Sequence, residues 1–201
     1  MIAIIDYGMG NLRSVQKALE KVGGQAMVTQ NPQDLTNAQG IVLPGVGAMR
    51  PAMGQLNALG FTTAIKKNVE AGKPFLGICL GCQLLFETSD EGGKVQGLGL
   101  LKGEVKRFPS LKIPQIGWNQ LNVQQTDCPL LTKMKTPSFV YFCHSYYVKP
   151  NDANVVAATT DYGIEYASLV WQKNIFGVQF HPEKSQTIGL NLLKNFLDYQ
   201  P

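Results

Sequence analysis

Residues that bind metal ions are scarce in this sequence. Its 201 residues include only two histidines and four cysteines: His144, His181, Cys79, Cys82, Cys128 and Cys143. One pair of cysteines has the spacing C-x-x-C, and the other two cysteines form no second pair of that kind. A zinc site would need two more ligands at suitable spacing. The scarcity argues against a zinc protein, and we expect neither a metal ion nor a cofactor.

Long apolar runs and a strong net charge are also lacking. No stretch approaches the ~20 apolar residues that span a bilayer, and the first apolar run stops at Asp6 with no basic residue before it. We therefore expect no membrane segment and no signal peptide, and a cytoplasmic protein with reduced thiols. The net charge is only +4, so no nucleic-acid partner is expected. The tightest basic group indicates a solvated mixed surface or a patch for an anionic partner: Lys102, Lys106, Arg107 and Lys112.

The first half of the chain alternates between strand-like and helix-like segments. Short apolar runs predict strands at 2–6, 25–29, 40–45 and 73–78. Apolar residues at helical spacing predict a helix from Asn11, as N-cap, to the stop at Gly23 and Gly24. Further helices are expected at 51–58, 61–71 and 80–87. This alternation predicts βαβ units around a mostly parallel sheet.

The second half contains mainly strand-like segments. They lie at 99–108, 118–124, 138–148, 154–160, 166–172 and 175–180. The chain closes on a helix with one apolar face: Ile188, Leu192, Leu193, Phe196 and Leu197. No linker or repeat is visible. We predict an α/β fold in a single domain, residues 1–201, with a mostly parallel twisted central sheet flanked by helices and an antiparallel extension in the C-terminal half.

The segment "GICLG" places Cys79 between Gly77 and Gly81, after a strand and before a helix. This G-x-C-x-G pattern is the cysteine version of a nucleophile elbow, a tight turn that presents its central residue at the end of a sheet. A helix N-terminus favours the thiolate, and the N–H of Leu80 would point at a developing oxyanion. A buried cysteine in an ordinary turn is the alternative.

Two further segments supply partners for a cysteine nucleophile. "FHPE" places His181 and Glu183 just after a strand, where His181 could act as base and acid and Glu183 could orient its ring. "LPGVG" follows the third strand, and the N–H of Val46 or Gly47 could complete an oxyanion hole. Taken alone, these segments also fit a loop histidine beside an acid and a turn with two glycines.

Two rival interpretations fit the sequence less well. "DYGMGNLR" contains G-x-G, but Arg13 stands where a dinucleotide fingerprint has its third glycine, and no acid closes the second strand. A thioredoxin-like reaction of Cys79 with Cys82 fits the position of the pair. It leaves "FHPE" and "PGVG" without a role, so a single nucleophile is favoured over a redox pair.

The segments "PGVG", "GICLGCQLLFE" and "GVQFHPEKS", in this order, closely resemble the class I glutamine amidotransferases. "IDYGMGNLRSV", "IGWN" and "CHSYYV" look like those of the glutaminase subunits of imidazole glycerol phosphate synthases, and the similarity extends over essentially the whole chain. The resemblance implies Cys79 as nucleophile, His181 as base and acid, and Glu183 as its orienter. It implies an oxyanion hole formed by the backbone of Val46, Gly47 and Leu80, and a glutamine pocket formed by Gly47, Gln83, Ser145 and Tyr146.

The resemblance also implies a partner. Ammonia released from glutamine would pass to a cyclase subunit, a (β/α)8 barrel, in a heterodimer that serves histidine biosynthesis. Trp118 is a candidate interface residue, or a plain surface or core tryptophan. Three alternatives remain: an amidotransferase subunit with a different acceptor, a cysteine hydrolase with another substrate, and a catalytically silent binding subunit.

Overall fold

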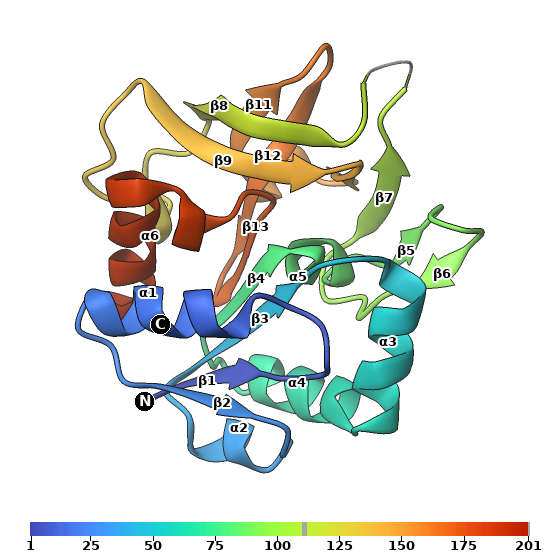
Figure 1. Ribbon diagram of the computed structural model, residues 1–201, viewed down its shortest axis with the longest axis vertical. Coiled ribbons are helices and arrows are strands. Elements are labelled where there is room, and N and C mark those ends of the chain that lie inside the picture. The colour runs from blue at the N-terminus through green and yellow to red at the C-terminus, as the bar shows by residue number, and fades with distance from the viewer. Residues whose placement is uncertain (110–111, 201) are drawn as a thin grey trace.

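A 13-stranded sheet runs through the part of the chain that the computed structural model describes, residues 1–109 and 112–200 (Figure 1). Its first five strands are parallel to one another. In spatial order they are β2 (Ala26–Thr29), β1 (Ile2–Ile5), β3 (Gly40–Gly45), β4 (Phe75–Cys79) and β13 (Ile175–Val178). β13 therefore joins the parallel part although it lies near the end of the chain, and it brings its following loop beside the end of β4.

The antiparallel extension begins at the other edge of β13. The next strands in space are β12 (Glu165–Gln172), β10 (Tyr146–Pro150), β7 (Gly103–Arg107), β5 (Thr88–Ser89) and β6 (Val95–Gln96), of which β5 is parallel to β7. A branch leaves β12 through β11 (Val156–Asp161), β8 (Gln115–Val123) and β9 (Ser138–His144). The predicted fold class is confirmed, whereas the two-residue strands β5 and β6 were not predicted.

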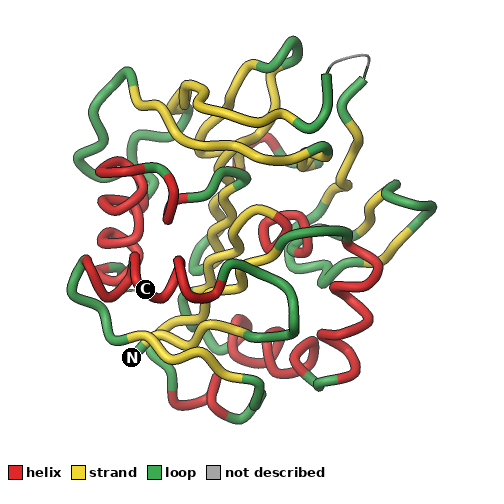
Figure 2. Tube along the Cα trace, viewed as in Figure 1, coloured by secondary structure: helices red, strands yellow, loops and turns green. Residues whose placement is uncertain are grey.

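Helices cover both faces of the parallel strands (Figures 1 and 2). Ile2 and Ile4 of β1 pack in a cluster with α1 and α6, and Ala3 and Ile5 pack in a second cluster with α3 and α4. This alternation follows from the two-residue period of a strand. Asn11 occupies the N-cap position of α1 as predicted, but its side chain makes no capping hydrogen bond. The helices are α1 (Leu12–Lys21), α2 (Asp34–Asn37), α3 (Met49–Ala58), α4 (Phe61–Glu70), α5 (Leu80–Leu84) and α6 (Gln186–Asp198).

The helix predicted at 80–87 is shorter than expected. The carbonyl oxygen of Leu84 accepts a hydrogen bond from the N–H of Leu98, and that of Leu85 accepts one from Leu100, each at 2.8 Å. These carbonyls are therefore engaged by a distant loop and do not continue the helix. Tertiary hydrogen bonds outweighed the local pattern, and the prediction beyond the end of α5 was wrong.

The segment predicted as one strand at 138–148 forms two. β9 pairs with β8, whereas β10 pairs with β7 and β12. Ser145 stands at the switch between these neighbours. The break turns the backbone of Ser145 and Tyr146 toward the end of β4, so an irregularity that the pattern missed helps to build the site.

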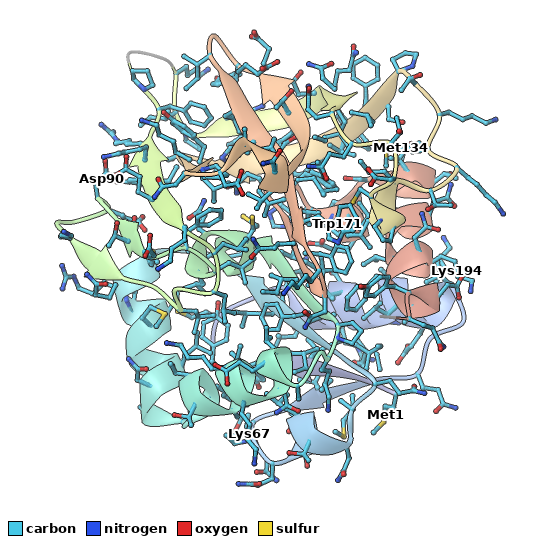
Figure 3. The ribbon with its side chains drawn as sticks, turned by 180° about the vertical axis from the view of Figure 1, so that it is seen from behind. Met1, Lys67, Asp90, Met134, Trp171 and Lys194 are labelled. Atoms are coloured by element: carbon cyan, nitrogen blue, oxygen red, sulfur yellow. The ribbon has the colours of Figure 1, made fainter. Side chains whose placement is uncertain are left out.

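Aromatic side chains fill the junction between the parallel and antiparallel parts. Trp171 of β12 lies near the middle of the view in Figure 3. Its ring is stacked on Phe176 of β13, with centroids 6.5 Å apart and planes at 3°. The edge of Phe176 meets Phe196 of α6 at 6.2 Å. This junction anchors β13, and with it the loop that follows.

Two of the four cations in the basic group near β7 are paired with acidic side chains. The Lys102 ammonium lies 2.8 Å from a Glu87 carboxylate oxygen, and that of Lys106 lies 2.9 Å from Glu104. Exposed pairs of this kind contribute little stability. Arg107 and Lys112, the other two members of the group, form no ion pair among the described residues, so the positive charge here is only partly compensated.

Candidate active site

The end of β4 holds Cys79 in a strained backbone conformation, with φ 55° and ψ −108°, directly before α5. Such strain costs on the order of 1–3 kcal/mol and persists where neighbouring structure imposes it. A Cβ on Gly81 would lie 1.8 Å from the carbonyl oxygen of Leu43, and one on Gly77 would lie 2.5 Å from the carbonyl oxygen of Gly81. The sharp strand-to-helix turn expected at Cys79 is thus present, and it requires both glycines.

His181 and Glu183 follow β13, which pairs with β4 in parallel. His181 Nδ1 lies 2.9 Å from Glu183 Oε1, and both side chains are buried. The backbone N–H of His181 donates to the carbonyl oxygen of Tyr141 at 2.9 Å, and a 3-10 turn, Pro182–Lys184, carries Glu183 back to the ring. Because Nδ1 faces Glu183, Nε2 is the nitrogen left for Cys79.

Cys79 and Glu183 both affect the pKa of His181. Burial lowers its pKa, but hydrogen bonds to the side chains of Cys79 and Glu183, together with their charges, outweigh burial and raise the pKa to about 10. The imidazole is then cationic at neutral pH and has a proton to give.

A pocket of about 300 Å³ opens over Cys79 and His181. It is small enough for an amino acid rather than a large cofactor. The residues expected in the site meet around it: Val46, Gly47, Cys79, Leu80, Gln83, Ser145, Tyr146 and His181 all line it, and Glu183 lies behind His181. The sequence-predicted residues are therefore one cluster in space, although they come from four separate segments.

The backbone segments that the sequence predicts as an oxyanion hole lie around Cys79. Gly45 of β3 is in register with Cys79, so the turn at Val46 and Gly47 lies beside the nucleophile. Gly47 has φ 87°, a conformation that favours glycine. Leu80 begins α5, where the first N–H groups have no partner within the helix.

Gln83 lies one turn after Cys79, with its side chain buried. Its Nε2 donates to the carbonyl oxygen of Tyr146 at 3.0 Å and to Gln179 Oε1 at 3.1 Å. The amide nitrogen is thus fully used. Because Gln83 also lines the pocket, its oxygen is the atom left for a ligand.

Sequence reasoning assigned no role to several polar residues at the site, among them Glu91, His144, Gln179 and Lys184. Glu91 lines the pocket, and its Oε2 accepts a hydrogen bond from the N–H of Met49 at 2.8 Å. His144 is buried, and burial lowers its pKa to about 4, so it is neutral. Gln179 is fully buried two residues before His181. A glutamine inside an otherwise apolar strand pattern was the one available signal for it.

Other hollows of the described chain bring no such groups together. A cavity of about 660 Å³ lies at the opposite end of the parallel strands, lined by residues that include Met1, Lys73 and Tyr199. Among residues 1–109 and 112–200, no cluster of three or more histidine, cysteine or acidic side chains could hold a metal ion. No helix in these ranges has the length and apolar character that a bilayer crossing needs.

Comparisons with known proteins identify the family. A family model described as "Glutamine amidotransferase class-I" matches residues 3–199, and the chain belongs to this family. Its curated relatives include the proteins called "Imidazole glycerol phosphate synthase subunit HisH" from Syntrophotalea carbinolica and Moorella thermoacetica. The first is 54% identical, covering 98% of this chain and 100% of the relative, and the second is 53% identical, covering 97% and 93%. The resemblance inferred from the motifs is confirmed.

Solved structures agree on the fold. The "Structure of PurLQS from Thermotoga maritima" contains a chain that matches with a TM-score of 0.79 and 23% identity, covering 98% of this chain and 97% of that one. A "Crystal structure of glutamine amidotransferase" matches with a TM-score of 0.78 and 21% identity, covering 98% of both. At such identities the likeness concerns the fold alone.

Proposed function

We propose that this chain is the glutaminase subunit of an imidazole glycerol phosphate synthase, hydrolysing glutamine to glutamate and ammonia for a cyclase partner in histidine biosynthesis. Sequence similarity to HisH subunits over nearly the full length of the chain supports the assignment. The observation that carries the chemistry is that Cys79 and His181 line one pocket while His181 is hydrogen-bonded through Nδ1 to Glu183. The proposed catalytic residues are these three.

In the first half of the reaction, the Cys79 thiolate attacks the side-chain amide carbon of glutamine. The carbonyl oxygen becomes an oxyanion, which the backbone N–H of Leu80 and that of Val46 or Gly47 stabilise. Donors of this kind each contribute about 2.7–4 kcal/mol to catalysis. His181 then donates its proton to the amide nitrogen, the carbon–nitrogen bond breaks, and ammonia leaves an acyl-thioester on Cys79.

In the second half, water hydrolyses the thioester. His181, now neutral, accepts a proton from the water as it attacks the thioester carbon. The carbon–sulfur bond breaks, glutamate leaves, and the thiolate and the imidazolium are restored. Glu183 holds the ring through Nδ1 in both halves, so that Nε2 always faces the reacting atoms.

The pocket's polar lining suits the amino-acid end of glutamine. The free oxygen of Gln83 can accept a bond from a substrate N–H, and the Glu91 carboxylate offers a counter-charge for the α-ammonium group. Ser145 and Tyr146, at the break between β9 and β10, also line the pocket. Gly47 lines the pocket as well, with the positive φ that favours glycine.

A patch on β8 and β9 is the surface that we assign to the cyclase, expected to be a (β/α)8 barrel. Ile116, Trp118 and Phe139 are 62%, 49% and 48% exposed. Large apolar groups exposed together mark association sites. Ile116 pairs in register with Cys143, which lines the pocket, so the patch adjoins the ammonia source. Trp118→Ala should weaken binding of the cyclase while leaving the melting temperature of the free chain unchanged.

Cell location and domain organisation are part of the same proposal. All four cysteines are free, which fits a cytoplasmic protein. The family match over residues 3–199 supports a single domain at 1–201.

The test is a glutaminase assay of the chain with and without the cyclase and its nucleotide ligand. Cys79→Ala should abolish ammonia release, and Cys82→Ser, its matched neighbour, should retain most of it because Cys82 is buried against Gly177. Equal loss in both variants would contradict the assignment of the nucleophile. A rate that does not rise with the cyclase would indicate a subunit that serves another acceptor.

A further inference from the structure

Gln179 connects the nucleophile to the substrate pocket through its side chain. It follows β13 directly and is fully buried. Its Nε2 lies 3.8 Å from Cys79 Sγ, within hydrogen-bonding distance for sulfur, and its Oε1 accepts the bond from Gln83. Its backbone N–H donates to Ser168 at 2.9 Å, which fixes the main chain beneath the side chain.

The orientation of the Gln179 amide is imposed by a backbone carbonyl. The carbonyl oxygen of Tyr146 can only accept, so it selects the NH₂ end of Gln83. That NH₂ group needs an oxygen as its second partner, so the oxygen of Gln179 faces Gln83. The NH₂ end of Gln179 must then face the sulfur. His144 Nδ1 adds a second bond to the Tyr146 carbonyl at 2.7 Å, which holds this anchor in place.

An amide N–H directed at sulfur favours the thiolate, because a hydrogen bond to the charged form stabilises that form. Besides His181, the sulfur has a polar contact with the carbonyl oxygen of Cys143 at 3.9 Å, which can only accept. Gln179 is therefore a fixed, uncharged hydrogen-bond donor to the Cys79 sulfur, whereas the Cys143 carbonyl oxygen is an acceptor. Its second bond also keeps Gln83 turned toward the ligand.

We propose that Gln179 is a further active-site residue, whose amide stabilises the Cys79 thiolate and at the same time sets the orientation of Gln83 in the glutamine pocket. The second role rests on the proposed function. The first concerns the sulfur alone, so the two can be tested separately.

The first experiment measures alkylation of Cys79 by iodoacetamide against pH in the free chain, followed at that residue by mass spectrometry. Gln179→Met, which keeps the shape and removes the donor, should move the midpoint of the profile upward by about one pH unit or more, since a hydrogen bond to a charged group contributes about 1.5–3 kcal/mol. Gln179→Asn, whose amide is one methylene too short, should move it in the same direction. The other titratable groups around the sulfur, Tyr7, Cys82 and His181, are unchanged in these variants.

The matched control is Asn174→Leu. Asn174 is a buried amide just before the other end of β13, where it donates to the carbonyls of Val69 and Lys73 at 2.9 and 2.8 Å. The Asn174→Leu substitution should lower the melting temperature without moving the alkylation midpoint of Cys79. A wild-type midpoint in a folded Gln179→Met or Gln179→Asn protein would overturn the proposal, as would an equal shift in Asn174→Leu.

The second experiment measures glutaminase kinetics in the complex with the cyclase. Gln179→Met should lower kcat by about 10- to 100-fold and raise KM. Gln83→Met should raise KM too, and because it removes the partner that orients the Gln179 amide, it should move the alkylation midpoint in the same direction as Gln179→Met but by less. Normal kcat and KM in Gln179→Met would overturn the role in turnover. If the wild-type complex releases no ammonia while the midpoint still shifts, the proposed function fails and the contact with sulfur stands.

Discussion

Replacing Gly81 by alanine tests whether the approach of α5 to β3 builds the site. The new Cβ would lie 1.8 Å from the carbonyl oxygen of Leu43. Carbon–oxygen contacts in proteins lie near 3.3 Å, so helix and strand must separate by about 1.5 Å. The obstructing atom belongs to the backbone of a buried parallel strand, and no rotamer change can relieve the clash. We expect destabilisation of at least about 2–3 kcal/mol, which lowers the melting temperature by roughly 5–10 °C for a chain of this size.

The same displacement should also impair catalysis. Leu43 precedes the turn at Val46 and Gly47, and Gly81 follows Leu80, so the two halves of the proposed oxyanion hole would move apart. A misplacement of about 1 Å can cost 100-fold in rate, and we expect kcat in the cyclase complex to fall by about that factor. Ammonia release and calorimetry measure the two effects.

The control is Gly54→Ala, in the exposed middle of α3, where an added Cβ meets nothing within 4 Å. This change should raise stability by up to about 1 kcal/mol and leave kcat unchanged. Wild-type melting temperature and kcat in Gly81→Ala would refute the reasoning, because they would mean that helix and strand can separate freely.

Three further results are expected. Glu183→Gln removes a hydrogen-bonded negative charge from Nδ1 and should lower the pKa of His181, which an NMR titration measures directly. In the wild type, the raised pKa of His181 stabilises the fold fully below pH 6.5, which is the usual pKa of an unfolded histidine, and this contribution is lost as the pH rises toward 10. The unfolding free energy should therefore decline less between pH 6.5 and 10 in Glu183→Gln than in the wild type. Tyr7→Phe should leave the unfolding free energy unchanged or raise it, measured by urea titration, because the Tyr7 hydroxyl is buried without a partner among the described residues. Burial raises the pKa of the Cys82 and Cys128 thiols, so a disulfide reagent should modify both only after unfolding.

The parallel half of the fold could be predicted because its signals are local. Strands β1, β3, β4 and β13 are apolar runs bounded by glycine or polar residues, and the helices between them carry regular apolar faces. The end of α5 and the break at Ser145 could not be predicted in this way. Both depend on partners far along the chain: Leu98 for the first and the change of neighbouring strand for the second.

The residues of the candidate site likewise fall into those that a local motif identifies and those that only the fold brings to the site. Cys79, Gly81 and His181 stand in short motifs whose spacing carries chemical meaning, so the sequence points to them. Gln179 and Glu91 have no motif of their own, and only the fold shows that one reaches the sulfur and the other lines the pocket.

The strain at Cys79 connects the fold to the chemistry. A residue at φ 55° would relax if β4 were a free strand, but β3 and β13 hold it on both sides, with Gly45 and Val178 fixing the register. Each of these strands also carries one functional group at its end: the Val46–Gly47 turn on β3, and His181 on β13. The pairing that maintains the strain therefore also sets the distances of the proposed oxyanion donor and the proposed base from the sulfur. Any change that slips one strand should lose the nucleophile's conformation and its partners together, so the site assembles only when the central sheet is complete.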